Sequence, residues 1–221
     1  MTPEELCRLH PELFHVSAPD AWPMMKKYGL LSTANILDLL GIDQKEERER
    51  LLKQRRPFPV PLCHPTKGTI IINDNKPLSE KALSQILDDN LTPEDWLMML
   101  NSRIFFWSNG QATQRLLQAR INRGRKRLVL VVDTQKLARD YLNNMEISPI
   151  NSGSTIRKAA RRGLQTFTPL GDLPYREWQK LRGHNDKILE VIVRDSIPNI
   201  QKYVLRHHVT SGDKDPEILM M

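Results

Sequence analysis

The stretch Leu128-Val129-Leu130-Val131-Val132-Asp133 consists of five aliphatic residues closed by one carboxylate. It shows no alternation of polar and apolar residues, which favours a strand buried on both faces. The run is far shorter than the ~20 residues that a membrane-spanning helix needs. We therefore expect a central buried strand in a chain that is soluble and makes no membrane contact.

Outward from this strand, helix and strand signals follow one another irregularly. Further strands are expected at Leu13–Val16, Thr69–Ile72, Ile104–Trp107, Ile188–Val193 and Gln201–Val209. Helices are expected at Thr2–Leu9, Asp20–Tyr28, Thr33–Leu40, Asp43–Arg56, Ser79–Leu87, from Thr92, and at Gln111–Asn122, Thr134–Asn143 and Pro174–Leu181. The prolines between 57 and 65 indicate an extended loop. This irregular order predicts an α+β fold with one domain over residues 1–221, of which 211–221 form a frayed tail.

Some helix boundaries follow from short local motifs. Thr2 and Glu5 match a capping box, with Pro3 in the first turn between them. The same pattern recurs at Thr92-Pro93-Glu94-Asp95. Asp20 is expected to cap the second helix.

Composition bounds the environment and the partners. Lys and Arg number 33 against 26 Asp and Glu, for a net charge of +7. Much of the excess gathers in two clusters, at residues 120–127 and 157–162, which favour a polyanionic partner, although a merely solvated basic face would read the same. Cys7 and Cys63 are far apart, and Cys63-His64 lacks further ligands for zinc, so no metal is expected. The start of the chain has no secretory signal, and we expect a cytoplasmic protein.

Two polar residues lie within apolar strand segments. Glu190 interrupts Ile188–Val193, and an unpaired buried carboxylate is costly, so it faces either a cleft or ordinary solvent. His15 and Ser17 share one strand face by period-2 geometry, where His15 is either a ligand contact or a histidine satisfied by the backbone. Trp107 ends an aromatic strand and is either core or a stacking surface. Neither GxGxxG nor GxxxxGK[ST] is present, so a nucleotide would not be held by those two loops.

The order of these segments resembles the ADP-ribosyltransferase superfamily, and within it the DarT-like bacterial toxins and related bacterial proteins. Phe14-His15-Val16-Ser17 is similar to the opening His-x-Thr strand of that family, and the helix ending in Gly29-Leu30-Leu31 follows it. Ile104-Phe105-Phe106-Trp107 resembles the middle strand, and Leu189-Glu190-Val191 resembles the strand that carries the catalytic glutamate. The chain departs from DarT-like enzymes at Ser108-Asn109-Gly110-Gln111, where they carry an arginine.

The resemblance implies a split mixed sheet with short helices around it, and NAD as co-substrate. It implies Glu190 and His15 as catalytic residues, and it places these residues against NAD: His15, Val16, Ser17, Tyr28, Leu31, Ser32, Trp107, and Arg103 or Arg115 in place of the missing turn arginine. Contacts with a nucleic-acid acceptor are expected at Asn151, Ser152, Arg120, Arg123, Arg125, Lys126, Arg157, Lys158, Arg161 and Arg162.

The implied function is transfer of one ADP-ribose from NAD to DNA or RNA. The implied role is the toxin of a toxin–antitoxin or phage-defence system, with an antitoxin as a second partner. Three alternatives stay open: the same transfer to a protein, a nucleic-acid-binding module without catalysis, and an RNA 2′-phosphotransferase. The last relies on several arginines around the site, for which only Arg103 and Arg115 are candidates.

Overall fold

The computed structural model describes residues 1–120, 122, 124–156, 159–171, 174, 176, 177, 180 and 188–211. The helices are α1 (Pro3–Leu9), α2 (Trp22–Tyr28), α3 (Thr33–Leu39), α4 (Lys45–Lys53), α5 (Glu80–Leu83), α6 (Pro93–Asn101), α7 (Gly110–Gln118) and α8 (Thr134–Tyr141), with 3-10 turns η1 (Leu142–Asn144), η2 (Leu164–Thr166) and η3 (Ile200–Lys202). The strands are β1 (Glu12–Ser17), β2 (Leu30–Leu31), β3 (Val60–His64), β4 (Gly68–Ile72), β5 (Arg103–Trp107), β6 (Arg127–Asp133), β7 (Met145–Ser148), β8 (Thr168–Pro169), β9 (Glu190–Arg194), β10 (Ser196–Ile197) and β11 (Val204–Thr210).

The largest sheet among the described residues has seven strands in the order β11-β6-β1-β5-β9-β7-β8. Its strand pairs are antiparallel, so the α+β expectation is confirmed, whereas the expected mixed sheet is wrong. β6 lies inside the sheet, and its five aliphatic residues are at most 2% exposed. Because both faces of β6 are covered, the chain needs no polar alternation there.

Strand β1 has two unequal neighbours. It pairs with β6 along its whole length, from Glu12 opposite Asp133 to Ser17 opposite Leu128. Its register with β5 is the single pair Phe14 and Trp107. Between these two fully described strands the ladder therefore stops after one pair, and the strands separate toward the carboxyl end of β1.

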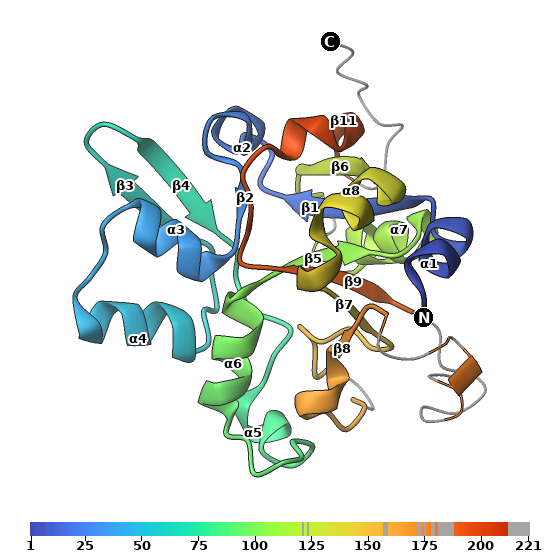
Figure 1. Ribbon diagram of the computed structural model, residues 1–221. Helices are drawn as coiled ribbons and strands as arrows, with labels where there is room; N and C mark the ends of the chain where they lie inside the picture. Colours follow the sequence, from blue (N-terminus) through green and yellow to red (C-terminus); the bar gives the residue numbers. More distant parts are fainter. Residues whose placement is uncertain are drawn as a thin grey trace.

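Three apolar clusters fill the space around the sheet. One face packs Leu13, Leu130, Phe106 and Val191 against α1, α2 and α8, and Ile192 on the other face packs against Trp96 of α6. A third cluster joins α3 and α4 to the β3–β4 hairpin. Figure 1 shows this third unit on one side of the molecule and α1, α7 and α8 on the other.

Several boundaries depart from expectation for physical reasons. Both capping boxes form, at Thr2 with Glu5 and at Thr92 with Asp95. The cap expected at Asp20 is wrong, because α2 begins after Ala21 and has no side-chain cap. The proline-rich segment is not all loop, because it contains β3. Within the part of the chain that the structure describes, β3 pairs with β4 only, and a proline costs little on a strand with a free edge.

The expected helix at 174–181 and tail at 211–221 lie largely outside the described residues. β7 was not expected, since four residues give too short a pattern to read. None of the described helices is long and apolar enough to cross a membrane.

Candidate active site

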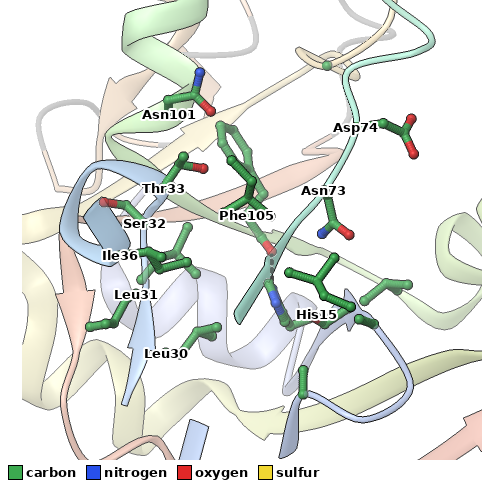
Figure 2. Close-up of a pocket in the computed structure, with 18 of the residues that line it drawn as sticks. His15, Leu30, Leu31, Ser32, Thr33, Ile36, Asn73, Asp74, Asn101 and Phe105 are labelled. Carbon is green, nitrogen blue, oxygen red and sulfur yellow. Dashed lines mark hydrogen bonds between the residues drawn. The ribbon is translucent and has the colours of Figure 1, made fainter. Parts of the chain in front are cut away.

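A cavity of about 430 Å³ opens where β1 and β5 separate. Its walls come from segments far apart in the sequence: the end of β1 with the following turn, the α2–β2–α3 turn, β4 with residues 73–75, β5, and the segment after β7. Figure 2 shows Ser32 and Thr33 on one side of Phe105 and Asn73 and Asp74 on the other. Of the residues expected to contact NAD, only Arg115 is absent from the described lining; it lies exposed on α7.

Glu190 occupies a corner of this cavity where three strand ends meet. It is the first residue of β9, and it lies opposite Trp107, the last residue of β5, and Ser148, the last residue of β7. The residue is 5% exposed, so the solvent-facing alternative for Glu190 is wrong. A carboxylate buried to this degree needs partners.

Its partner is Ser152. The backbone N–H of Ser152 donates to both carboxylate oxygens at 3.2 Å, and the Ser152 hydroxyl donates to Oε2 at 2.7 Å. Burial nevertheless raises the pKa of Glu190 from 4.5 to about 7, because the bonds from Ser152 and the charge of Arg162 offset only part of the desolvation. A pKa in this range suits a group that transfers protons near neutral pH.

The loop that carries Ser152 is held from behind. The carbonyl oxygen of Ser152 accepts a hydrogen bond from Nη1 of Arg162 at 2.9 Å and another from Nε1 of Trp96 at 3.3 Å. Arg162 is 2% exposed, and its guanidinium lies 5.7 Å from the centre of the Trp96 ring. The expectation that Arg162 contacts nucleic acid is therefore wrong, because this side chain is inside the protein.

His15 lies at the separation of the two strands. Its Nδ1 is 2.9 Å from the carbonyl oxygen of Phe105, the bond drawn in Figure 2. A carbonyl oxygen only accepts, so Nδ1 carries the proton, and burial lowers the pKa of the ring, which favours its neutral form. Nε2 of a neutral ring with this tautomer is a hydrogen-bond acceptor.

Apart from Arg115, the other residues expected to contact NAD lie along the wall of the cavity. Ser17 and Val16 follow His15 along the cavity wall, and Tyr28 and Leu31 flank the turn after α2. The Ser32 hydroxyl is engaged as the cap of α3: it accepts from the Asn35 N–H and donates to Asn35 Oδ1 at 2.7 Å.

Arg103 is tied into the structure. Its guanidinium makes a two-pronged ion pair with Glu146, with Nε at 2.7 Å from Oε2, and also donates to the Met99 carbonyl. Both side chains are nearly buried. Its charge is therefore balanced by Glu146 within the protein, and Arg115 is exposed on α7.

Part of the basic segment adjoins the cavity. Arg120 and Lys126 are exposed, and Arg125 lies 3.8 Å from Asp74. Asn122 and Arg127 from the same segment line the cavity itself. Arg161 is exposed and pairs with Asp88, Asn151 borders the cavity, and Arg123, Arg157 and Lys158 lie outside the described residues.

Sequence reasoning missed two parts of the cavity. Asn73 and Asp74 follow directly after the apolar strand β4, and a polar run at a strand end was a usable signal. Arg127 is the first residue of the buried strand β6, and burial lowers the pKa of its guanidinium. Among the described basic residues of the lining, Arg56 donates to backbone and amide oxygens, and Arg103 pairs with Glu146. The Arg127 guanidinium makes a long bond to Asn122 at 3.4 Å and lies close enough to Asp74 to be attracted by its charge.

The described residues contain no group of three or more His, Cys, Asp or Glu side chains placed to hold a metal ion. The Cys63 thiol instead lies 3.3 Å from the Thr69 hydroxyl.

Comparison with known proteins gives a family and a structural likeness. A family model described as a family of unknown function, DUF7002, matches residues 11–204. A solved structure, Thermosipho africanus DarTG in complex with ADP-ribose, is similar with a TM-score of 0.44 and 13% sequence identity. The likeness covers 90% of this chain but 44% of that one, so this chain spans less than half the length of the solved chain. No curated protein matches the sequence.

Proposed function

The chain belongs to DUF7002, a family of unknown function, and we propose from its own cavity that it is an NAD-dependent ADP-ribosyltransferase. The observation that carries the proposal is the Glu190 carboxylate, buried at a meeting of three strand ends and fixed by Ser152 beside Trp107. Such a carboxylate is suited to a reaction in which positive charge develops on the substrate.

The cavity suits NAD in size and in chemistry. Its volume of about 430 Å³ falls in the range of pockets that hold small molecules. Trp107 and Tyr28 offer aromatic surface for a ring, and Arg127 offers a positive charge for the diphosphate. Neutral His15 offers the Nε2 acceptor to a ribose hydroxyl.

In the proposed reaction the bond between nicotinamide nitrogen and the ribose carbon C1 breaks, and its electron pair leaves with nicotinamide. The ribose becomes oxocarbenium-like, and ionised Glu190 stabilises this charge and orients the ribose 2′-hydroxyl. The acceptor atom then bonds to C1 and gives its proton to a base, for which Glu190, with a pKa of about 7, is suited.

The proposed acceptor is a nucleic acid. Arg120, Arg125 and Lys126 belong to the same segment as Asn122 and Arg127, which line the cavity, so a polyanion bound there would lie beside the site. Asn151 borders the cavity and would contact the acceptor. Together with the resemblance of the sequence to DarT-like toxins, this favours a cytoplasmic toxin that is neutralised by an antitoxin.

Labelled NAD incubated with the chain and with separate DNA, RNA and protein pools tests this function. The proposal expects label in a nucleic acid and free nicotinamide. Label found in the protein pool alone would show that the acceptor is a protein and not a nucleic acid, while the proposed transfer of ADP-ribose would stand. Salt-sensitive binding of nucleic acid without any NAD turnover would support the alternative of a binding module.

A further inference from the structure

We infer that Arg162 is a positioning residue that acts on Glu190 through Ser152. The inference rests on the proposed function for its effect on rate, but its effect on Glu190 itself does not need that function. No hydrogen bond joins Arg162 to the carboxylate; Arg162 binds the carbonyl of Ser152, the residue whose N–H and hydroxyl donate to Glu190.

The loop at Ser152 works as a clamp with two sides. Toward the cavity, one N–H and one O–H of Ser152 converge on the Glu190 carboxylate. Away from the cavity, the Ser152 carbonyl takes bonds from Arg162 and Trp96. Because bonds on both sides hold the backbone of Ser152, they also fix its Cβ, from which the hydroxyl reaches the carboxylate.

Arg162 is itself anchored by its backbone. Its N–H donates to the Ile86 carbonyl at 2.9 Å, and its carbonyl accepts from the Asp88 N–H at 2.8 Å. The residue thereby forms a parallel bridge with Leu87. The guanidinium also donates through Nε to the Ala160 carbonyl, so an arginine at this place is held at both ends.

The clamp bears on the chemistry because a carboxylate must stand in a fixed place before charge develops on the substrate. Donors to a carboxylate favour its ionised form, which is the form that stabilises positive charge. Without the clamp, Glu190 would bind its proton more tightly and would occupy several orientations. The expected kinetic signature is a lower kcat with little change in the KM for NAD.

The test follows the carboxyl carbon of Glu190 by NMR in the full chain labelled at glutamate, with the signal assigned by its loss in Glu190→Gln. Ser152→Ala should raise the pKa of Glu190 by about one unit, a tenfold change in proton affinity, while Ser152→Thr keeps the hydroxyl and should restore the wild-type value. Arg162→Gln should also raise it, and Arg161→Gln, at the exposed neighbour paired with Asp88, should not.

A double variant distinguishes an effect of Arg162 through Ser152 from a direct electrostatic effect of the Arg162 charge on Glu190. If Arg162 acts through Ser152, Arg162→Gln should shift the pKa less in the Ser152→Ala background than in the wild type. Additive shifts, or an unchanged pKa in Ser152→Ala, would overturn the inference; the latter holds even if the Arg162 variant fails to fold. If the wild type releases no nicotinamide, the proposed function fails, while the titration still decides the clamp.

Discussion

Nδ1 of His15 lies 2.9 Å from the carbonyl oxygen of Phe105, so a side chain bridges β1 and β5 where their backbone ladder has stopped. This bond satisfies a carbonyl that the separation of the strands would leave without its usual partner. It also fixes the tautomer that leaves Nε2 as an acceptor. The separation of β1 and β5 therefore both opens the cavity and places His15, with Nε2 as an acceptor, in its wall.

His15→Phe is expected to weaken NAD binding about fivefold, since one lost hydrogen bond is worth about 1 kcal/mol. His10→Phe is a matched control. His10 makes the same kind of bond, from Nδ1 to the Ser108 carbonyl at 2.8 Å, but it is not part of the cavity lining. Calorimetric titration with NAD compares the two variants, and equal losses of affinity would contradict a binding role for His15.

Stability should depend on pH through Glu190. Burial raises its pKa from 4.5 to about 7, so between these values the folded chain holds a proton that the unfolded chain has released. The stability present below the unfolded pKa is lost as pH rises through the folded one, by roughly 3 kcal/mol for a shift of this size.

Glu190→Gln removes that dependence, so its free energy of unfolding relative to wild type should improve by this order between about pH 5 and about pH 8. Urea unfolding at both pH values measures the difference. If the difference in free energy of unfolding between wild type and Glu190→Gln is the same at both pH values, folding does not raise the pKa of Glu190.

Arg127→Gln should weaken binding of ADP-ribose about tenfold or more, because a charge-assisted bond to a phosphate is worth about 1.5–3 kcal/mol. Arg139→Gln removes an equal charge from α8, where Arg139 is exposed and pairs with Asp140. Both affinities are read by calorimetry at one ionic strength. Should the two variants lose affinity alike, net charge and not a contact of Arg127 would explain the effect.

Gly29 is required where α2 turns into β2. Its φ is +88°, and a Cβ there would lie 2.6 Å from Cα of Pro198 and 2.7 Å from the Ile197 carbonyl. Gly29→Ala should therefore cost about 3 kcal/mol or more, from strain and from contact with backbone that cannot move freely.

Gly41→Ala is the matched comparison, since Gly41 has a φ of +65° and open space around it. Strain alone should cost about 1 kcal/mol there. Thermal unfolding of both variants separates the two contributions. If Gly29→Ala costs no more than Gly41→Ala, the approach of the 197–198 backbone is looser than described.

The features that the sequence predicted correctly are those that depend on residues close together in the chain. The capping boxes at Thr2 and Thr92 and the buried strand at Leu128–Val132 depend on neighbouring residues, and they formed as expected. Glu190 stood out as a carboxylate in an apolar segment, but the alternation of side chains along a strand does not show which face is exposed to water. Its partner Ser152 is 38 positions away, and no sequence pattern joined the two.

Arg162 is a residue that the sequence placed on the surface and the structure places in the interior. As one of several basic residues in a row it was expected on the surface, because charged side chains are seldom buried unless paired. Three oxygen and ring partners hold it inside instead: the Ser152 carbonyl, the Ala160 carbonyl and the Trp96 ring. Those partners are set by the tertiary fold, so the basic run at 157–162 could not reveal which of its members is structural.

The most direct measurement of the central claim is the rate of nicotinamide release from NAD by wild type, Glu190→Gln and Glu146→Gln. Glu146 is a second buried carboxylate of the same sheet, paired with Arg103 and not part of the cavity lining. The account predicts release by wild type, a loss of at least a hundredfold in Glu190→Gln, and retained release in folded Glu146→Gln. Equal release by wild type and Glu190→Gln, or none by wild type with DNA, RNA or protein present, would contradict it.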